Sequence, residues 1–177
     1  MPLLRGRRAL SGSVRRSRPR YEWLVAASNL TAVGANTTSV FTIASAAALE
    51  EFPRCTILRI RGSLTVNPAT SPAAASGYVV WMGIAALTSD SAGWDPETNI
   101  EFPWMWHEMI APQMGGTGVS NDNSSRWAAY FRIAFDVRAK RKTQENTVVQ
   151  LLVKNSNQSA AAVQFLAVSR CLVLVGH

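Results

Sequence analysis

The strongest constraint on the fold of this chain is residues 126–137, in which apolar and polar side chains alternate. Successive side chains of a β-strand point to opposite faces of a sheet, so this period of two predicts a strand with one buried face. The face expected to be buried carries Trp127, Ala129, Phe131, Ile133, Phe135 and Val137. A similar alternation over residues 55–66 predicts another strand. Its core face carries Leu58, Ile60, Leu64 and Val66, between Arg59, Arg61, Ser63 and Thr65.

Further strands are predicted along most of the chain. They cover residues 37–44, 78–87, 147–154 and 161–175, and residues 21–48 as a whole predict one or two extended segments. On the last strand Leu166, Val168, Leu172 and Leu174 line one side. The intervening residues 138–146 indicate a charged connection and residues 155–159 a turn.

Helix is scarcely predicted, apart from one helical turn at residues 46–51. Because strands do not alternate with helices, a parallel sheet is disfavoured. The pattern predicts an all-β fold, an antiparallel β-sandwich of jelly-roll type, over residues 21–177.

One long loop interrupts this rhythm at about residues 88–125, where glycines and prolines exclude long regular elements. Its first half concentrates four large aromatic residues. These are Trp94, Phe102, Trp104 and Trp106. A long loop this aromatic in a compact domain is typical of a packed contact surface, so we expect these residues at a subunit interface.

The net positive charge is confined to one end of the chain. The 18 Lys and Arg exceed the 11 Asp and Glu by the formal net charge of +7. Residues 1–20, here called the Arg-rich segment, hold seven arginines and no acidic residue, so this segment carries the whole excess. The arginines are Arg5, Arg7, Arg8, Arg15, Arg16, Arg18 and Arg20. Guanidinium groups pair bidentately with phosphate oxygens, so we expect this basic, extended N-terminal arm to bind nucleic acid.

Two other interpretations of the Arg-rich segment stay open. It is either a solvated terminus without a partner or a cleaved transit peptide of an organelle-targeted β-sandwich binding protein, cut near Tyr21. A transit peptide needs a helix with segregated faces, and Arg7 and Arg18 fall on the apolar side of such a helix. Genome binding is therefore favoured.

A second basic cluster follows the best predicted strand. It comprises Arg138, Lys140, Arg141 and Lys142. It is either a solvated turn or an extension of the phosphate-binding surface. Aromatic residues are not interleaved with these basic residues, apart from Tyr21 and Trp23 at the end of the Arg-rich segment. We therefore expect sequence-independent, salt-sensitive binding rather than an RNA-recognition module.

The sequence does not predict an enzyme. His107 has no second histidine at ligand spacing, and acidic residues such as Asp95 and Glu97 are expected to be solvated or paired rather than catalytic. Cys55 and Cys171 are too few for a metal cluster and are expected as buried thiols in strands. No metal or cofactor is expected. No membrane partner is expected either, because the chain lacks the run of roughly eighteen apolar residues needed to cross a bilayer.

This plan resembles the capsid proteins of small icosahedral viruses: an Arg-rich arm, then a neutral, strand-rich body with one aromatic excursion. The most similar in plan are the single jelly-roll coat proteins of circular single-stranded DNA viruses and of satellite RNA viruses. The resemblance implies a homo-oligomeric T=1 shell of roughly 60 copies, an arm that neutralises a single-stranded genome inside it, and a virion assembled inside the host cell.

Overall fold

A computed structural model describes residues 19–29, 31–34, 36–52, 55–68, 78–88, 94–102, 104–110, 131–157 and 163–175. Strands dominate this part of the chain. They are β1 (Arg20–Ala27), β2 (Thr31–Val33), β3 (Thr37–Ala44), β4 (Thr56–Pro68), β5 (Tyr78–Leu87), β6 (Trp106–Ile110), β7 (Phe131–Lys142), β8 (Val148–Asn157) and β9 (Val163–Val175). Helix α1 (Ala46–Glu50) is the predicted helical turn, and the Ser45 side chain caps it by accepting from the Ala48 N–H.

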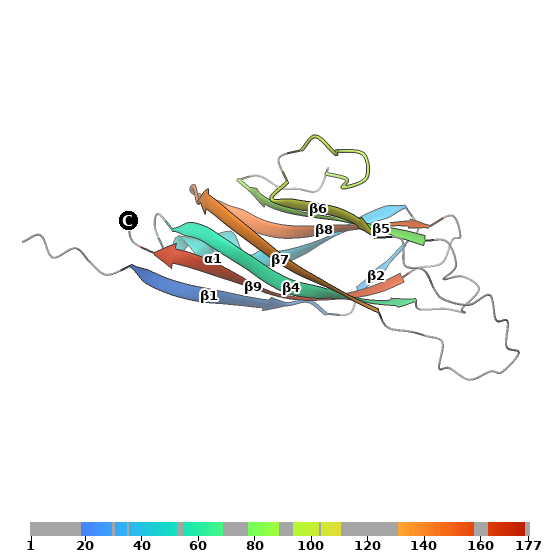
Figure 1. The fold of residues 1–177 in the computed structure, drawn as a ribbon, viewed down its shortest axis with the longest axis horizontal. Coiled ribbons are helices and arrows are strands. Elements are labelled where there is room, and N and C mark those ends of the chain that lie inside the picture. Colours follow the sequence, from blue (N-terminus) through green and yellow to red (C-terminus); the bar gives the residue numbers. More distant parts are fainter. Residues whose placement is uncertain are drawn as a thin grey trace, which may run out of the picture.

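The strands form two antiparallel sheets packed face to face (Figure 1). One sheet has the order β1-β9-β4-β7, with β2 also beside β9, and the other has the order β3-β8-β5-β6. The chain changes sheet at almost every step, so neighbours within a sheet come from distant parts of the sequence. This strand order is that of a jelly roll, and it confirms the predicted all-β sandwich.

The core lies between the two sheets and takes apolar side chains from both. Its fully buried members include Ile57, Ile60, Leu64, Val66, Val80, Met82, Ile84, Val149, Leu151, Phe165 and Val173. Burying each large side chain stabilises the fold by about 1.5–3 kcal/mol, so these buried side chains from the two sheets are the main source of stability.

Strand β7 extends further than the alternation predicts. Residues 126–130 of the predicted strand lie outside the described residues, whereas the charged residues 138–142 continue the strand instead of forming a connection. They do so because Lys142 and Arg141 still pair with Thr56 and Ile57 of β4. Strand β8 likewise continues to Asn157, opposite Tyr78, where a turn was predicted.

The core face of β4 was predicted with one wrong residue. Ile57 is fully buried, whereas Leu58 is only half-buried. The cause is a register shift between Ile57 and Arg59, which changes the phase of the alternation.

Leu166, Val168, Leu172 and Leu174 were predicted to line one side of the last strand. On β9 the buried side is the opposite one. Phe165, Cys171 and Val173 are buried, while Val168 is 44% exposed. Both predicted buried thiols are confirmed, although Cys55 lies just before β4. Burial, with a smaller effect of Cys55, raises the pKa of Cys171 to about 12, so this thiol stays protonated.

Two segments hold more strand than predicted. Residues 21–48 form β1, β2 and β3, and the long loop contains the five-residue strand β6, which pairs with β5. Within the described residues, no helix is long and apolar enough to span a membrane.

We predict that Gly62→Ala destabilises the subunit by about 2 kcal/mol, because an added methyl group overpacks this site. A Cβ at Gly62 would lie 2.5 Å from both the Phe135 ring and the Val168 carbonyl oxygen. Urea unfolding measures the loss. Gly34→Ala is the control, because its nearest contact would be an ordinary 3.5 Å to Thr37. Equal stability of the two variants would contradict this account of the Gly62 packing.

Candidate nucleic-acid interface

The Arg-rich segment meets the described fold at Arg20, the first residue of β1. Arg20 pairs with Val175 in the sheet, and its side chain forms an ion pair with Glu22 at 2.5 Å. The other six arginines of the segment lie outside the described residues. These are Arg5, Arg7, Arg8, Arg15, Arg16 and Arg18.

The structure divides the second basic cluster, with three of its residues on one side of β7 and one on the other. Arg138 lies opposite the outward-facing Arg59, and Lys140 and Lys142 share its side of the strand. Arg141 lies opposite the fully buried Ile57 and therefore projects from the core side, where it remains exposed at the end of the sandwich.

The strand register places further basic residues beside this cluster. On the side of the five-stranded sheet that faces away from the core, here called the outer cationic face, the described residues include seven Lys or Arg and one carboxylate, Asp136. The basic residues are Arg59, Arg61, Arg132, Arg138, Lys140, Lys142 and Arg170. The alternation in the sequence predicts Arg59 and Arg61 on a polar face of a strand, but Arg59, Arg61, Arg132 and Arg170 were not among the residues predicted for the interface.

Asp136 binds the two arginines of β4. Arg59 donates from Nε and Nη2 to the two carboxylate oxygens at 2.6 and 2.5 Å, and Arg61 Nε donates to Oδ2 at 2.9 Å. The hydrogen bonds from Arg59 and then Arg61 lower the pKa of Asp136 to about 2 despite partial desolvation. This carboxylate therefore stays charged and offsets one of the seven positive charges.

Strand β1 adds aromatic and apolar surface to the same face. Tyr21 is 58% exposed, Trp23 42% and Val25 75%. The guanidinium of Arg170 lies 4.9 Å from the centre of the Trp23 ring, a cation–π contact.

The aromatic residues of the long loop pack mainly on their own subunit. The Trp94 ring lies 3.9 Å from that of Phe102 and is tilted by 38° to it. Phe102 meets Trp104 edge-on at 4.8 Å, and Trp104 stacks at 5.6 Å on His107. Trp104 covers Gly83 of β5, where a Cβ would lie 2.5 Å from its ring.

Trp106 instead contacts the core, 5.7 Å from the Phe135 ring. All four predicted interface residues are half-buried, so each keeps some exposed surface. Their role in subunit contact stays a prediction.

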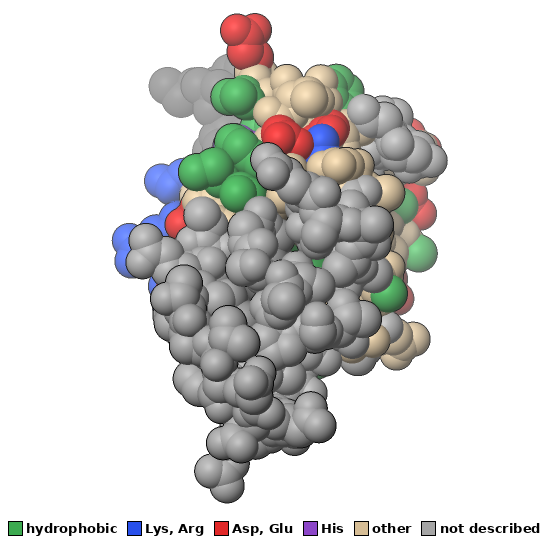
Figure 2. All heavy atoms as spheres, turned by 90° about the vertical axis from the view of Figure 1, so that its right-hand side faces the viewer, with side chains coloured by type: hydrophobic (Ala, Val, Ile, Leu, Met, Phe, Trp, Pro, Cys, Tyr) green, Lys and Arg blue, Asp and Glu red, His purple; other side chains and the backbone are tan. Residues whose placement is uncertain are grey.

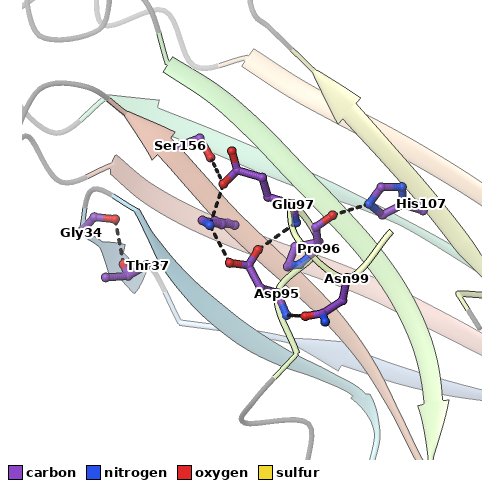
Figure 3. Close-up of polar contacts among 9 residues, drawn as sticks. Gly34, Thr37, Asp95, Pro96, Glu97, Asn99, His107 and Ser156 are labelled. Atoms are coloured by element: carbon purple, nitrogen blue, oxygen red, sulfur yellow. Dashed lines mark hydrogen bonds and ion pairs between the residues drawn. The ribbon is translucent and has the colours of Figure 1, made fainter. Parts of the chain in front are cut away.

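An ion-pair cluster attaches this loop to β8. Lys154, whose side chain is 9% exposed, contacts Asp95 Oδ2 at 2.5 Å and Glu97 Oε2 at 2.6 Å. Figure 3 shows the two carboxylates turned toward the same amino group, with Ser156 Oγ donating to Glu97 at 2.7 Å. Asp95 and Glu97 are thus engaged in holding the loop.

The charge states in this cluster follow from their partners. Burial alone would raise the pKa of Asp95 and lower that of Lys154, but their mutual hydrogen bond reverses both directions. The hydrogen bonds from Lys154 and Ser156 lower the pKa of Glu97. All three groups are therefore charged at neutral pH.

His107 is a packed residue of β6. Its Nε2 donates to the Pro96 carbonyl oxygen at 2.5 Å, and its ring stacks on those of Trp81 and Trp104. Within the described residues, no group of three His, Cys, Asp or Glu side chains is arranged to hold a metal ion.

No protein-family model matches the sequence, and no curated protein sequence matches it. Solved virus structures resemble the fold at low sequence identity. Turnip yellow mosaic virus shares 14% identity at a TM-score of 0.44, covering 90% of this chain and 95% of that chain. The decameric BFDV capsid protein shares 9% identity at 0.42, covering 90% and 100%. Cocksfoot mottle virus shares 13% identity at 0.41, covering 99% and 95%. The assignment of a jelly roll rests on the strand order itself.

We predict that Lys154→Met destabilises the subunit at pH 7 by about 2 kcal/mol, because it leaves two carboxylates facing each other without a cation. Asp95 and Glu97 have lowered pKa values when folded. Their contribution is therefore present above their ordinary values of 3.8 and 4.5, and is lost as the pH falls through the folded values. The difference between wild type and variant should accordingly shrink below about pH 4.

Chemical denaturation across pH 2–8 measures this difference. Lys142→Met serves as the control, because Lys142 is exposed and a surface substitution should change stability by less than about 0.5 kcal/mol. Identical curves for Lys154→Met and wild type at pH 7 would show that the cluster does not stabilise the fold.

Proposed function

We propose that this chain is a viral capsid protein, which self-assembles into a small icosahedral shell and packages a single-stranded nucleic-acid genome through the Arg-rich segment. The observation that carries this proposal is the separation of charge. An excess of seven positive charges precedes a body in which basic and acidic residues balance, and that body folds as a jelly roll.

The Arg-rich segment has the length and charge for this role. An extended arm of 20 residues reaches roughly 60 Å, enough to enter the lumen of a small shell. In a shell of roughly 60 copies, seven charges per copy bring roughly 400 positive charges to one genome. Such neutralisation does not depend on nucleotide sequence and weakens with salt.

We further propose that the aromatic part of the long loop contributes to subunit contacts. Trp94, Phe102, Trp104 and Trp106 each retain exposed surface, and Ile100 among them is 61% exposed. The ion-pair cluster at Lys154 fixes one end of this loop, so the contact surface is formed before subunits meet.

We predict that replacing Arg5, Arg7, Arg8, Arg15, Arg16 and Arg18 together by Gln leaves particles that assemble without nucleic acid. The replacement removes six of the seven charges of the segment and keeps Arg20 in β1. The measurement is the ratio of absorbance at 260 and 280 nm of particles purified on a density gradient.

Replacing the same six arginines by Lys is the matched control, because charge and length are kept. We expect these particles to contain nearly normal amounts of nucleic acid, since a lysine also neutralises phosphate. Normal packaging by the Gln variant would refute the role of the segment.

We predict that Ile100→Asp weakens assembly without unfolding the subunit, because the side chain already lies in solvent before contact. Losing a buried isoleucine contact costs about 1.5–3 kcal/mol, so the concentration needed for assembly should rise at least about tenfold. Sedimentation velocity measures the fraction in particles. Val40→Asp is the control, a 40% exposed position on β3, at the edge of the four-stranded sheet opposite to β6. Assembly of Ile100→Asp at the wild-type concentration would exclude Ile100 from the contact.

A further inference from the structure

A recess in the outer cationic face forms where β4 loses register with both neighbours. Ile57 and Arg59 pair with consecutive residues of β9, which leaves Leu58 without a partner there. The same two residues pair with Arg141 and Arg138 of β7, so Ala139 and Lys140 have no partner in β4. These three unpaired residues and three paired neighbours line a recess of about 480 Å³. Its lining is Leu58, Arg59, Arg138, Ala139, Lys140 and Leu172.

The chemistry of this recess is half apolar and half cationic. Leu58, Ala139 and Leu172 supply apolar surface, and no acidic residue lines the recess. Arg59 is held by Asp136, whereas Arg138 and Lys140 form no ion pair with a described residue. Such a site suits a ligand with a flat apolar part and a negative charge, which is the chemistry of a nucleotide unit.

The residues around the recess extend it into a track. Arg138, Lys140 and Lys142 stand on one side of β7 at every second position, roughly 6.7 Å apart. A stacked strand advances about 3.4 Å along its axis per nucleotide, so the spacing of these cations along β7 corresponds to an advance of two nucleotides.

One row of paired residues crosses the sheet at the recess. It consists of Trp23, Leu172, Arg59 and Arg138. The exposed Trp23 ring, backed by Arg170, offers a stacking surface for a base beside the recess.

The distribution of charge selects a polyanion over a second copy of the chain. Figure 2 shows the basic side chains gathered at one margin of that view, apart from one that lies among acidic side chains. On the four-stranded sheet and its loop, Glu101 and Glu108 are exposed, and Lys154 is ion-paired with Asp95 and Glu97. Two outer cationic faces placed together would oppose like charges.

We propose that the outer cationic face is a second nucleic-acid-binding surface, separate from the Arg-rich segment, on which the recess anchors one nucleotide of a single strand. The proposal rests on the proposed packaging function and adds a folded site to it. Arg20, the last residue of the Arg-rich segment, pairs with Val175. The next residue, Tyr21, lies in a row of paired residues that crosses the sheet through Leu174 and Thr56 to Lys142. A strand held by the segment can therefore continue directly onto the face.

Oligonucleotide binding by the full chain tests this site. In full-length protein with a 20-nucleotide single strand, the slope of log K against log salt should fall in magnitude by about 1.4 for Arg138→Ser with Lys140→Ser, at roughly 0.7 for each lost phosphate contact. Arg141→Ser is the matched control, since Arg141 lies on the same strand but projects from its other side. An unchanged slope for the double variant overturns the proposal.

Lysine labelling of the wild-type protein provides a second test that does not depend on a variant folding. The chain has only three lysines, Lys140, Lys142 and Lys154. We expect the oligonucleotide to slow acylation of Lys140 and Lys142 at least fivefold, while the enclosed Lys154 reacts slowly with or without it. If the acylation of Lys140 and Lys142 instead slows with rising protein concentration and does not depend on the oligonucleotide, the face is a contact between copies of the chain and the proposal is overturned.

The two proposals fail in different ways. If the double variant binds like wild type while the six-Arg Gln variant loses binding, the packaging role stands and the second surface is refuted. If the wild-type chain does not bind the oligonucleotide, both are refuted.

Discussion

The antiparallel pairing of β4 with β9 is the interaction on which the rest of the architecture depends. It joins residues 56–68 to residues 163–175, roughly 100 residues later in the chain. Strand β9 also pairs with β1 and β2, and β4 with β7, so each strand of this sheet contacts one of the two. Closing so long a loop costs conformational entropy before any contact forms. The complete burial of Ile60, Leu64 and Phe165 offsets that cost.

The same alternation that forms the core also separates charge. Every second residue of β4 and β7 enters the core, which leaves Arg59, Arg61, Arg138 and Lys140 together on the outer face. Like charges at this density repel one another, and Asp136 reduces that repulsion by binding Arg59 and Arg61. The face thus remains strongly positive while the sheet beneath it stays stable, which is the combination that a site for polyanions requires.

The sequence predicts what is local and misses what depends on distant partners. Period-two patterns located the long strands because alternation is a property of the backbone itself. They did not predict that β7 continues to Lys142, since its last residues are held by pairing with β4 and not by burial. On β9 both sides are partly apolar, so its core side is decided by the opposite sheet. The Lys154 cluster and the recess escaped prediction because each joins residues more than fifty positions apart.

The position of β7 has a further consequence. In the described sheet it is an outermost strand, and such a strand presents backbone groups that could pair with the same strand of another molecule. Two of the three lysines of the chain, together with Arg132 and Arg138, stand along it. Bringing two such edges together would align these charges against each other. The basic side chains therefore also protect the newly folded subunit from joining others edge to edge into fibrils.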